Sequence, residues 1–469
     1  MGNRNHSYRG FAGIAIAAFV VASPARADLA ARVAASVDPV IEAGLRSSAA
    51  PGAAFVFVQG GRIVYERGYG VADLASAAKV DAARTVWPIA SITKVVTAIA
   101  VLQLVDSGRV DLDADVNRYL KHLQLPAQGY PPLTLRHLLT HTGGLDELPG
   151  RQFDGQEPVD LATFLKDRLV RYRAPGLLTA YSTYGIMLAG LLLEDVSGQR
   201  YAACLRDHIF KPAGMTSARV MIRQGDERGV ATPYRLEDGK ATAVPYEWYR
   251  STPASSVVAT AEDMGRLLLV FLAGGQAGQQ QILSERLTKA MQRQQATVNS
   301  AVPGWSLGLQ MDRVNGRDVA EHGGDIGGFS ALFVLVPDED AGFFIINHGE
   351  GNDLRFDVKQ ALFDALWPTK RTPVVPVARA ADAGRLAEYA GDYLSSIACR
   401  SCPRDPDSVF TVTAKPDGTL SLWGQRWIPT GRDLFIRDDG KRNLGFARDA
   451  EGRVSAVSAG SWRVADRIW

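Results

Sequence analysis

Hydrophobic and polar positions divide the chain into strand-like and helix-like stretches. Alternating or β-rich runs at 53–58 and 62–67 are joined by Gln59-Gly60-Gly61, which predicts a hairpin. Strand patterns return at 306–311, 331–336 and 342–347, with turn residues at 314–316 and 337–340. Between these two groups, helical patterns occupy 91–105, 135–139, 183–196, 201–210 and 262–272. Hairpins around a helical middle predict an α+β fold, in which both ends of this region complete one antiparallel sheet and helices pack on it.

The pattern changes after Leu386 to short strands separated by Asp417-Gly418, Asp439-Gly440 and Glu451-Gly452. This predicts an all-β unit, a small barrel or sandwich, with a packing or substrate-shaping role. Residues 368–380 lack periodicity and contain three prolines, which is typical of a stiff linker. The 469 residues exceed what one core usually organises. We therefore predict a main domain at 28–367, a linker at 368–380 and a β domain at 381–469.

The N-terminal segment has the composition of a secretory signal peptide. Arg4 and Arg9 precede an apolar run at 11–22, and Ala25-Arg26-Ala27 follows as a small-x-small cleavage site. Cleavage after residue 27 would leave a mature chain that starts at Asp28, and no later apolar run approaches the eighteen residues of a membrane span. We expect a soluble periplasmic or secreted protein. The formal net charge of +2 gives no sign of a nucleic-acid partner.

Two of the three cysteines form the motif Cys399-Arg-Ser-Cys402. In an oxidising compartment, a local disulfide is the favoured interpretation. A redox motif would stand between a strand and a helix, and one C-x-x-C supplies only half the ligands of a zinc site, so both alternatives are weaker. Cys204 is expected to be a buried free thiol. The sequence predicts no metal site.

Ser91-Ile-Thr-Lys94 opens the apolar stretch 91–105, which is hydrophobic nearly all round and predicts a buried helix after a Trp87-Pro88 turn. Residues three apart share a helix face, so a neutral Lys94 amine can accept the proton of the Ser91 hydroxyl. Burial would lower the pKa of Lys94 from about 10.4 toward neutrality. The free N–H groups of the helix start would stabilise negative charge on the attacking oxygen. This predicts a serine nucleophile with a lysine base, and helix capping by Ser91 is the alternative.

Two later segments carry groups that fit the same chemistry. Tyr181-Ser182-Thr183 precedes an apolar helix, where a tyrosine can move protons between Ser91 and a leaving group. His322-Gly323-Gly324 offers paired glycines, which let a strand edge approach a substrate closely. The N–H of Asp325 would then join that of Ser91 as an oxyanion hole.

With these three elements in order, the chain resembles the superfamily of serine β-lactamases and penicillin-binding proteins. The resemblance is to the group of class C β-lactamases, D-aminopeptidases, DD-carboxypeptidases and family VIII-type esterases. It covers roughly residues 40–366 and includes supporting stretches at 135–145, 209–215, 260–264 and 322–329. It implies a β-lactamase/transpeptidase-like fold with a helical subdomain, to which some members append a small β domain.

The resemblance also implies roles for the motif residues. Ser91 would be the acylated nucleophile, and Lys94 and Tyr181 would share the acid and base work. His322 stands where other members have the lysine of K-T-G, and Thr183 replaces the asparagine of Y-x-N. These departures remove a permanent cation and an amide that contact substrate. They favour an esterase or peptidase over an efficient β-lactamase.

Other motif matches are weaker candidates for chemistry. Ser76-Ala-Ala-Lys79 also fits S-x-x-K but lies in a polar connection. Gly304-Trp-Ser306-Leu-Gly308 fits a nucleophile elbow, yet β structure is predicted after it, so Ser306 is expected in a strand. His137 and His141 have the spacing of a zinc pair without a glutamate between them, which favours structural histidines. Thr260-x-x-Asp263 predicts a helix capping box.

We therefore expect an exported serine hydrolase that acts through a covalent acyl-enzyme, with no cofactor or metal. Its partner would be a small-molecule or peptide substrate: a D-amino-acid peptide, an ester, a β-lactam-like compound or a peptidoglycan fragment. The alternative is a catalytically weak protein of the penicillin-binding type that binds or senses the cell wall.

Overall fold

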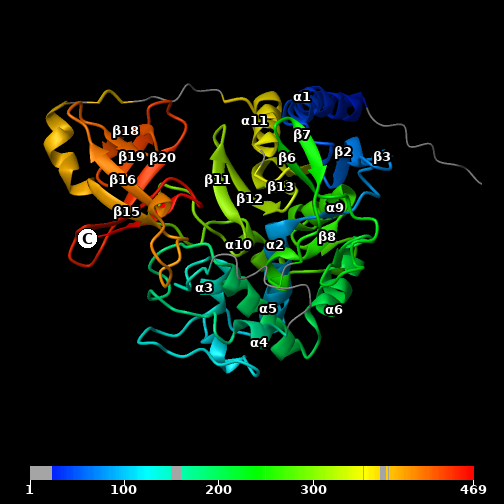
Figure 1. Cartoon of the computed structure of the whole chain (residues 1–469), viewed down its shortest axis with the longest axis horizontal. Coiled ribbons are helices and arrows are strands. Elements are labelled where there is room, and N and C mark those ends of the chain that lie inside the picture. Colours follow the sequence, from blue (N-terminus) through cyan, green and yellow to red (C-terminus); the bar gives the residue numbers. More distant parts are fainter. Residues whose placement is uncertain are drawn as a thin grey trace, which may run out of the picture.

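The structure, a computed structural model, describes residues 24–148, 160–248, 250–351, 353–369, 376–378 and 380–468. Its centre is a seven-stranded antiparallel sheet, and the α+β architecture predicted from the sequence is confirmed (Figure 1). From edge to edge the strands are β11 (Gln310–Val314), β12 (Arg317–Ile326), β13 (Phe329–Val336), β14 (Ala341–His348), β1 (Gly52–Gln59), β2 (Arg62–Asp73) and β3 (Ala78–Lys79). The N-terminal β1 pairs with the late strand β14, so distant parts of the chain complete the sheet.

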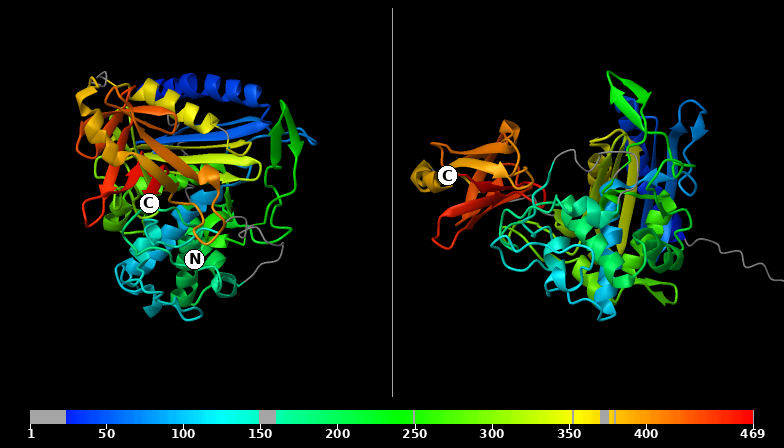
Figure 2. Two further views of the ribbon diagram at one scale, coloured as in Figure 1. Left: turned by 60° about the vertical axis from the view of Figure 1, so that its left-hand side comes forward. Right: turned by 60° about the horizontal axis from the view of Figure 1, so that its bottom comes forward.

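Helices cover both faces of this sheet, which explains why β1 is buried along nearly its whole length. Phe55 and Phe57 pack toward α1 (Pro24–Ser48) and α11 (Leu354–Leu366), which lie side by side on one face (Figure 2). Val56 and Val58 point to the other face, toward α2 (Thr93–Asp106) and α9 (Ala261–Leu272). Alternation along the strand therefore supplies both cores.

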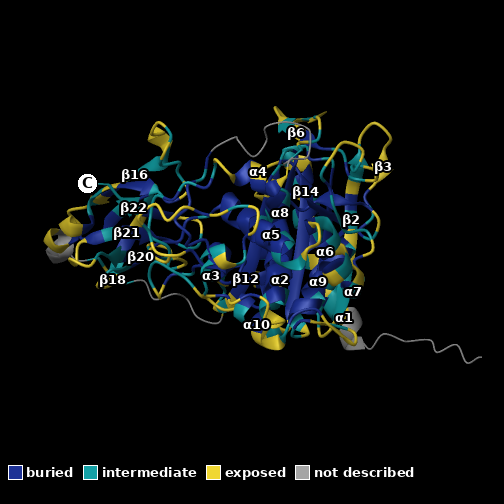
Figure 3. Ribbon diagram, turned by 90° about the horizontal axis from the view of Figure 1, so that it is seen from below, coloured by how far each residue is buried: buried dark blue, intermediate teal, exposed yellow. Residues whose placement is uncertain are grey.

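The helical part matches most of the predicted ranges. Buried helices α2 and α5 (Thr183–Ser197) lie side by side at its centre (Figure 3). The predicted helix 201–210 is α6 (Tyr201–Leu205) followed by a π-helical turn (Arg206–Phe210). The remaining helices are α3 (Leu135–Leu139), α4 (Leu161–Leu165), α7 (Lys211–Ala213), α8 (Thr252–Ser255) and α10 (Glu285–Met291). Short strands of the described residues form three further small sheets. The first contains β4 (Trp87–Pro88), β8 (Val257–Ala259) and β5 (Arg219–Val220), the second β6 (Tyr234–Glu237) and β7 (Lys240–Ala243), and the third β9 (Gln276–Ala277) and β10 (Gln280–Gln281).

The C-terminal region is a closed eight-stranded barrel with a core of its own, as the all-β pattern predicted. Its strands are β15 (Gly391–Ser395), β16 (Val409–Ala414), β17 (Leu420–Leu422), β18 (Gln425–Gly431), β19 (Leu434–Arg437), β20 (Asn443–Arg448), β21 (Val454–Ser458) and β22 (Val464–Arg467). The predicted glycine turns fall between strands of this barrel: Gly418, Gly440 and Gly452 all have positive φ.

The barrel is attached to the helical part by polar contacts. Asp466 of β22 pairs with Arg173 at 2.7 Å, and the Tyr172 hydroxyl donates to the Ser396 carbonyl at 3.2 Å. The carboxylate of buried Asp146 accepts hydrogen bonds from the backbone N–H groups of Arg400 and Ser401 at 2.7 and 2.9 Å. These two residues lie inside the loop that the Cys399–Cys402 disulfide closes.

Several local predictions differ from the structure. Ser306 is not in a strand: it directly precedes a bend at 307–309, ahead of β11, and its hydroxyl oxygen lies within hydrogen-bond distance of the Met291 carbonyl and accepts from the Leu309 N–H. Trp87 and Pro88 form β4 and not a turn. The buried helix begins at Thr93, two residues later than predicted.

Predictions on the signal peptide and the linker fall largely outside the described residues, which exclude 1–23, 370–375 and 379. Within the part of the chain that is described, no helix has the length and apolar character needed to cross a membrane.

Candidate active site

Ser91 lies in a tight 3-10 turn, Ala90–Ile92, at the entrance to α2. Ala90 has a left-handed φ of 48°, a conformation that costs an alanine about 1 kcal/mol or more and occurs mainly where surrounding structure enforces it. The Ile89 N–H donates to the Val257 carbonyl at 3.0 Å, which ties the turn to β8. The Ser91 side chain caps neither this turn nor α2, so the capping alternative is wrong.

Lys94 is the second residue of the buried helix α2 and reaches back to Ser91. Its Nζ lies 3.0 Å from Ser91 Oγ and donates to the Ala254 carbonyl, also at 3.0 Å. The side chain is only 1% exposed. Burial lowers the pKa of Lys94 to about 7, and the negative charge of Glu147 opposes this lowering. A large fraction of the amine is therefore neutral near pH 7 and able to accept a proton.

Tyr181 lies directly over this amine, with Lys94 Nζ 4.8 Å from the centre of its ring. Burial raises the pKa of the Tyr181 phenol, and the neighbouring Ser91 hydroxyl moderates the rise. The phenol oxygen is buried and makes no hydrogen bond of standard geometry with the described residues. A phenol held in its neutral form is suited to donate a proton, so Lys94 is the better base and Tyr181 the better acid.

The His322–Gly324 segment brings β12 against the Ser91 turn. A Cβ atom on Gly324 would lie 2.4 Å from the Ile89 carbonyl oxygen, so the strand can approach this closely only with glycine at that position. β11 pairs with β12 only as far as Glu321, which leaves the segment from His322 onward without a strand partner on that side. The approach of a substrate to this edge, which the paired glycines predict, stays a prediction.

His322 is fully buried and sits 6.2 Å from Tyr181 between ring centres. Its Nδ1 donates to the Gly323 carbonyl at 2.6 Å, so the proton is on Nδ1 and Nε2 carries the lone pair. Burial, together with the charge of Lys94, lowers the pKa of His322 to about 3. The residue that replaces a lysine is therefore neutral at physiological pH.

The carboxylate of Asp325 is held in contacts with neighbouring side chains. It forms a bidentate pair with Arg355 of α11, at 2.7 Å for each bond, and accepts a hydrogen bond from the Ser330 hydroxyl at 2.7 Å. The predicted oxyanion role concerns its backbone N–H and stays a prediction.

Thr183 and two residues missed by the sequence reasoning complete the polar surroundings. The Thr183 N–H donates to the Glu147 carboxylate at 2.9 Å, and burial raises the pKa of that carboxyl. The Ser182 N–H donates to His141 Nδ1 at 3.0 Å, which leaves the other ring nitrogen, Nε2, without a partner among the described residues. The His141 ring packs at a tilt against Tyr181, with 4.6 Å between ring centres, and His141 has a left-handed φ of 54°. No local pattern marked Glu147, while His141 had been assigned a structural role.

The other candidate residues lie in different environments. Ser76 donates its hydroxyl to Asp73 at 2.6 Å in an exposed turn. Ser306 is fully buried and bonded to backbone carbonyls. His137 and Asp263 take part in helix capping boxes, which confirms the box predicted at Thr260. The described residues contain no group of three or more His, Cys, Asp or Glu side chains arranged to hold a metal ion.

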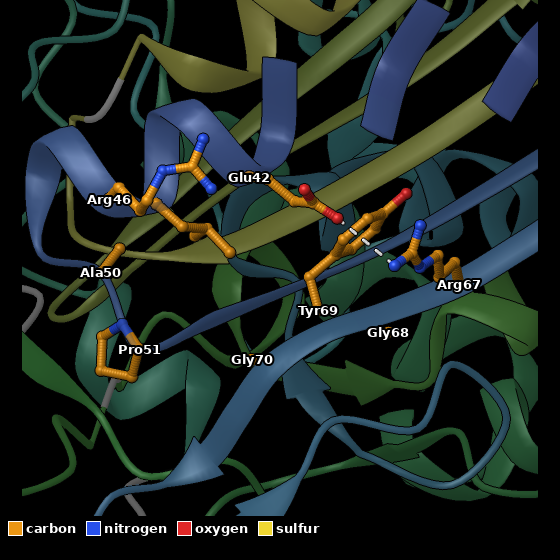
Figure 4. Close-up of a pocket in the computed structure, with 9 residues that line it drawn as sticks. Glu42, Arg46, Ala50, Pro51, Arg67, Gly68, Tyr69 and Gly70 are labelled. Carbon is orange, nitrogen blue, oxygen red and sulfur yellow. Dashed lines mark hydrogen bonds and ion pairs between the residues drawn. The ribbon is translucent and has the colours of Figure 1, made fainter. Parts of the chain in front are cut away.

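A surface hollow between α1 and β2 is separate from this cluster (Figure 4). Arg67 and Glu42, which line it, form an ion pair at 3.3 Å, and Arg46, Pro51 and Tyr69 complete much of the wall. None of the side chains discussed above lines this hollow.

Comparison with known proteins identifies a matching family and similar relatives. The family model described as Beta-lactamase matches residues 37–366. Esterase EstB from Burkholderia gladioli is 30% identical over 318 residues, which cover 60% of this chain and 79% of EstB. Protein flp from Staphylococcus aureus is 23% identical over 318 residues; the match covers 66% of this chain but only 62% of the length of that relative.

The likeness in three dimensions extends over the barrel as well. The octameric penicillin-binding protein homologue from Pyrococcus abyssi superimposes with a TM-score of 0.63 at 20% sequence identity. The superposition covers 92% of this chain and 99% of that one, so the two share the fold.

Proposed function

The chain belongs to the Beta-lactamase family, and on that premise we propose that it is a serine hydrolase that cleaves neutral esters through an acyl-enzyme on Ser91. The observation that carries this proposal is the 3.0 Å approach of Lys94 Nζ to Ser91 Oγ, combined with the burial that lowers the pKa of the amine to about 7. A nucleophile and a neutral base within hydrogen-bond reach are the minimum for covalent catalysis.

The proposed reaction follows from these contacts. Neutral Lys94 takes the Ser91 proton as Oγ attacks the ester carbonyl, and the negative charge forms beside the N–H groups of the Ser91 turn and β12. The Tyr181 phenol gives its proton to the leaving alkoxide and recovers one from Lys94. Water then attacks the acyl-enzyme, the same two groups move the proton in the opposite direction, and Ser91 is released.

Electrostatics favour a neutral substrate over a carboxylate. His322 is uncharged because its pKa is about 3, and burial holds His141 in its neutral form as well. Lys94 gives up its charge to act as base. The similarity to an esterase supports the same choice, which places esters ahead of β-lactams and D-peptides with free carboxylates.

A substrate panel tests the proposal. Short-chain esters, D-amino-acid amides and nitrocefin are incubated with the wild type and with Ser91→Ala. We expect ester hydrolysis that disappears in Ser91→Ala and persists in the matched serine variants Ser76→Ala and Ser306→Ala. Binding of peptidoglycan without turnover of any substrate would instead support the cell-wall-binding alternative.

We also propose that the protein is exported, because residues 1–27 have the charged, apolar and small-residue regions of a signal peptide. N-terminal sequencing of protein from the periplasmic or culture fraction should give Asp28 as the first residue. Recovery of an intact Met1 from the cytoplasm would refute export.

A further inference from the structure

The barrel places one aromatic side chain against the proposed acid of the active site. Trp462 lies in the loop between β21 and β22, and its ring centre is 4.4 Å from that of Tyr181. A second tryptophan, Trp305, is 5.7 Å from Tyr181 and 5.9 Å from Trp462. The three rings thus form a continuous aromatic group, which extends from the lysine base to the barrel.

The loop that carries Trp462 is fixed on both sides. Trp305 Nε1 donates to the Ser461 carbonyl at 3.1 Å, which ties the loop to the main domain next to the tryptophan. On the other side, Val464 packs in an apolar cluster with Leu178. A ring held in this way loses little conformational entropy when another group packs on it.

Trp462 nevertheless remains 43% exposed, whereas Trp305 is fully buried. What distinguishes Trp462 from other exposed apolar side chains is its contact with Tyr181, and a tryptophan ring supplies a large flat area on which a ligand group can pack. The side of Trp462 that Tyr181 does not contact therefore offers an apolar surface beside the groups that would act on the ester.

We propose that Trp462 is a specificity-determining residue, on which an aromatic or other flat apolar substituent of the ester packs. This inference rests on the proposed esterase function and assigns part of the substrate-binding surface to the barrel. The neutrality of His322 and His141 fits the same class of substrate, because a neutral apolar group needs no fixed cation to hold it.

Matched esters test the inference in a pH-stat: methyl acetate, methyl phenylacetate and phenyl acetate. In Trp462→Ala we expect kcat/KM for at least one aromatic ester to fall about five- to tenfold more than kcat/KM for methyl acetate. Because the contact would hold the substituent equally in the ground and transition states, the loss should appear in KM and not in kcat. Trp462→Phe should recover most of the affinity.

Leu74→Ala is the control, since Leu74 is also a large apolar side chain, 48% exposed, but lies between β2 and β3 at the edge of the sheet opposite β11 and β12. It should leave all three esters unchanged. A small alkyl fluorophosphonate should still label Ser91 in Trp462→Ala, which shows that the variant folds with a reactive nucleophile.

The outcomes separate the two proposals. Wild-type protein that neither hydrolyses esters nor reacts with the fluorophosphonate would refute the proposed function and the inference with it. An active wild type whose Trp462→Ala variant keeps the same preference among the three esters would refute the inference alone. Faster cleavage of the aromatic esters by Trp462→Ala would also contradict it, because Trp462 would then obstruct the site.

Discussion

The pH dependence of catalysis follows from the burial of Lys94. An ordinary lysine titrates at 10.5, whereas Lys94 titrates at about 7. At 1.36 kcal/mol per pH unit, the difference represents about 5 kcal/mol, the net result of burial, which disfavours the charged amine, and of Glu147, which favours it. The base is active only when neutral, so kcat/KM for a neutral ester should rise with pH, with an inflection near 7. The rise between pH 6 and pH 8 should be about tenfold.

A substitution of Glu147 tests the direction in which the pKa of Lys94 is predicted to shift. Its negative charge raises the pKa of Lys94, so Glu147→Gln, which keeps an acceptor for the Thr183 N–H, should move the inflection to lower pH. Initial rates at substrate concentrations well below KM, measured from pH 5.5 to 9, report both inflections. A flat profile in the wild type, an inflection above pH 9, or a shift to higher pH in Glu147→Gln would refute the assignment of Lys94 as base.

Three further substitutions test the packing around the site. Gly324→Ala places a Cβ 2.4 Å from the Ile89 carbonyl oxygen and should lower kcat/KM about a hundredfold by displacing the Ser91 turn. In Gly323→Ala the new Cβ meets only the Ala331 carbonyl oxygen, at 3.9 Å, so kcat/KM should stay within about threefold of the wild type. Equal effects of the two substitutions would contradict the close approach of β12 to the Ser91 turn. Asp146→Ala should lower the free energy of unfolding by about 2–3 kcal/mol in denaturant titrations, because the Asp146 carboxylate accepts two hydrogen bonds from the disulfide loop of the barrel. An unchanged denaturation midpoint would show that the loop does not depend on Asp146. Thr260→Ala should cost about 1 kcal/mol through loss of the α9 cap while kcat/KM stays unchanged; a loss of activity would mean that α9 acts on the site.

The sheet and the buried helices were predictable because the hydrophobic pattern of each element lies within a short stretch of sequence. Residues 91–105 are apolar all round, and burial on every side is the physical consequence of that pattern. Strand β12 was harder to delimit, since Arg317–Ile326 mixes charged residues with two glycines and owes its strand conformation to pairing with β13. Helix α1 was not predicted; it contains Pro39 and starts inside the proposed signal sequence.

The contact between Ser91 and Lys94 was predictable for a similar reason, because the three-residue spacing fixes their separation. Contacts between residues that are distant in the sequence leave no recognisable pattern in it. Glu147 meets Thr183 across 36 residues, and Trp462 meets Tyr181 across a domain boundary. His141 was recognised only as one member of an unlikely zinc pair, although its packing against Tyr181 places it in the site.

The most direct test of the central claim is the mass of the protein during turnover. Wild-type protein mixed with an activated ester and quenched within the first turnovers should gain the mass of one acyl group, located by peptide mapping on Ser91. Ser91→Ala should show no such adduct. Continued hydrolysis with no acylated protein under these conditions, or an acyl group mapped to Ser306 or any other residue, would contradict the account.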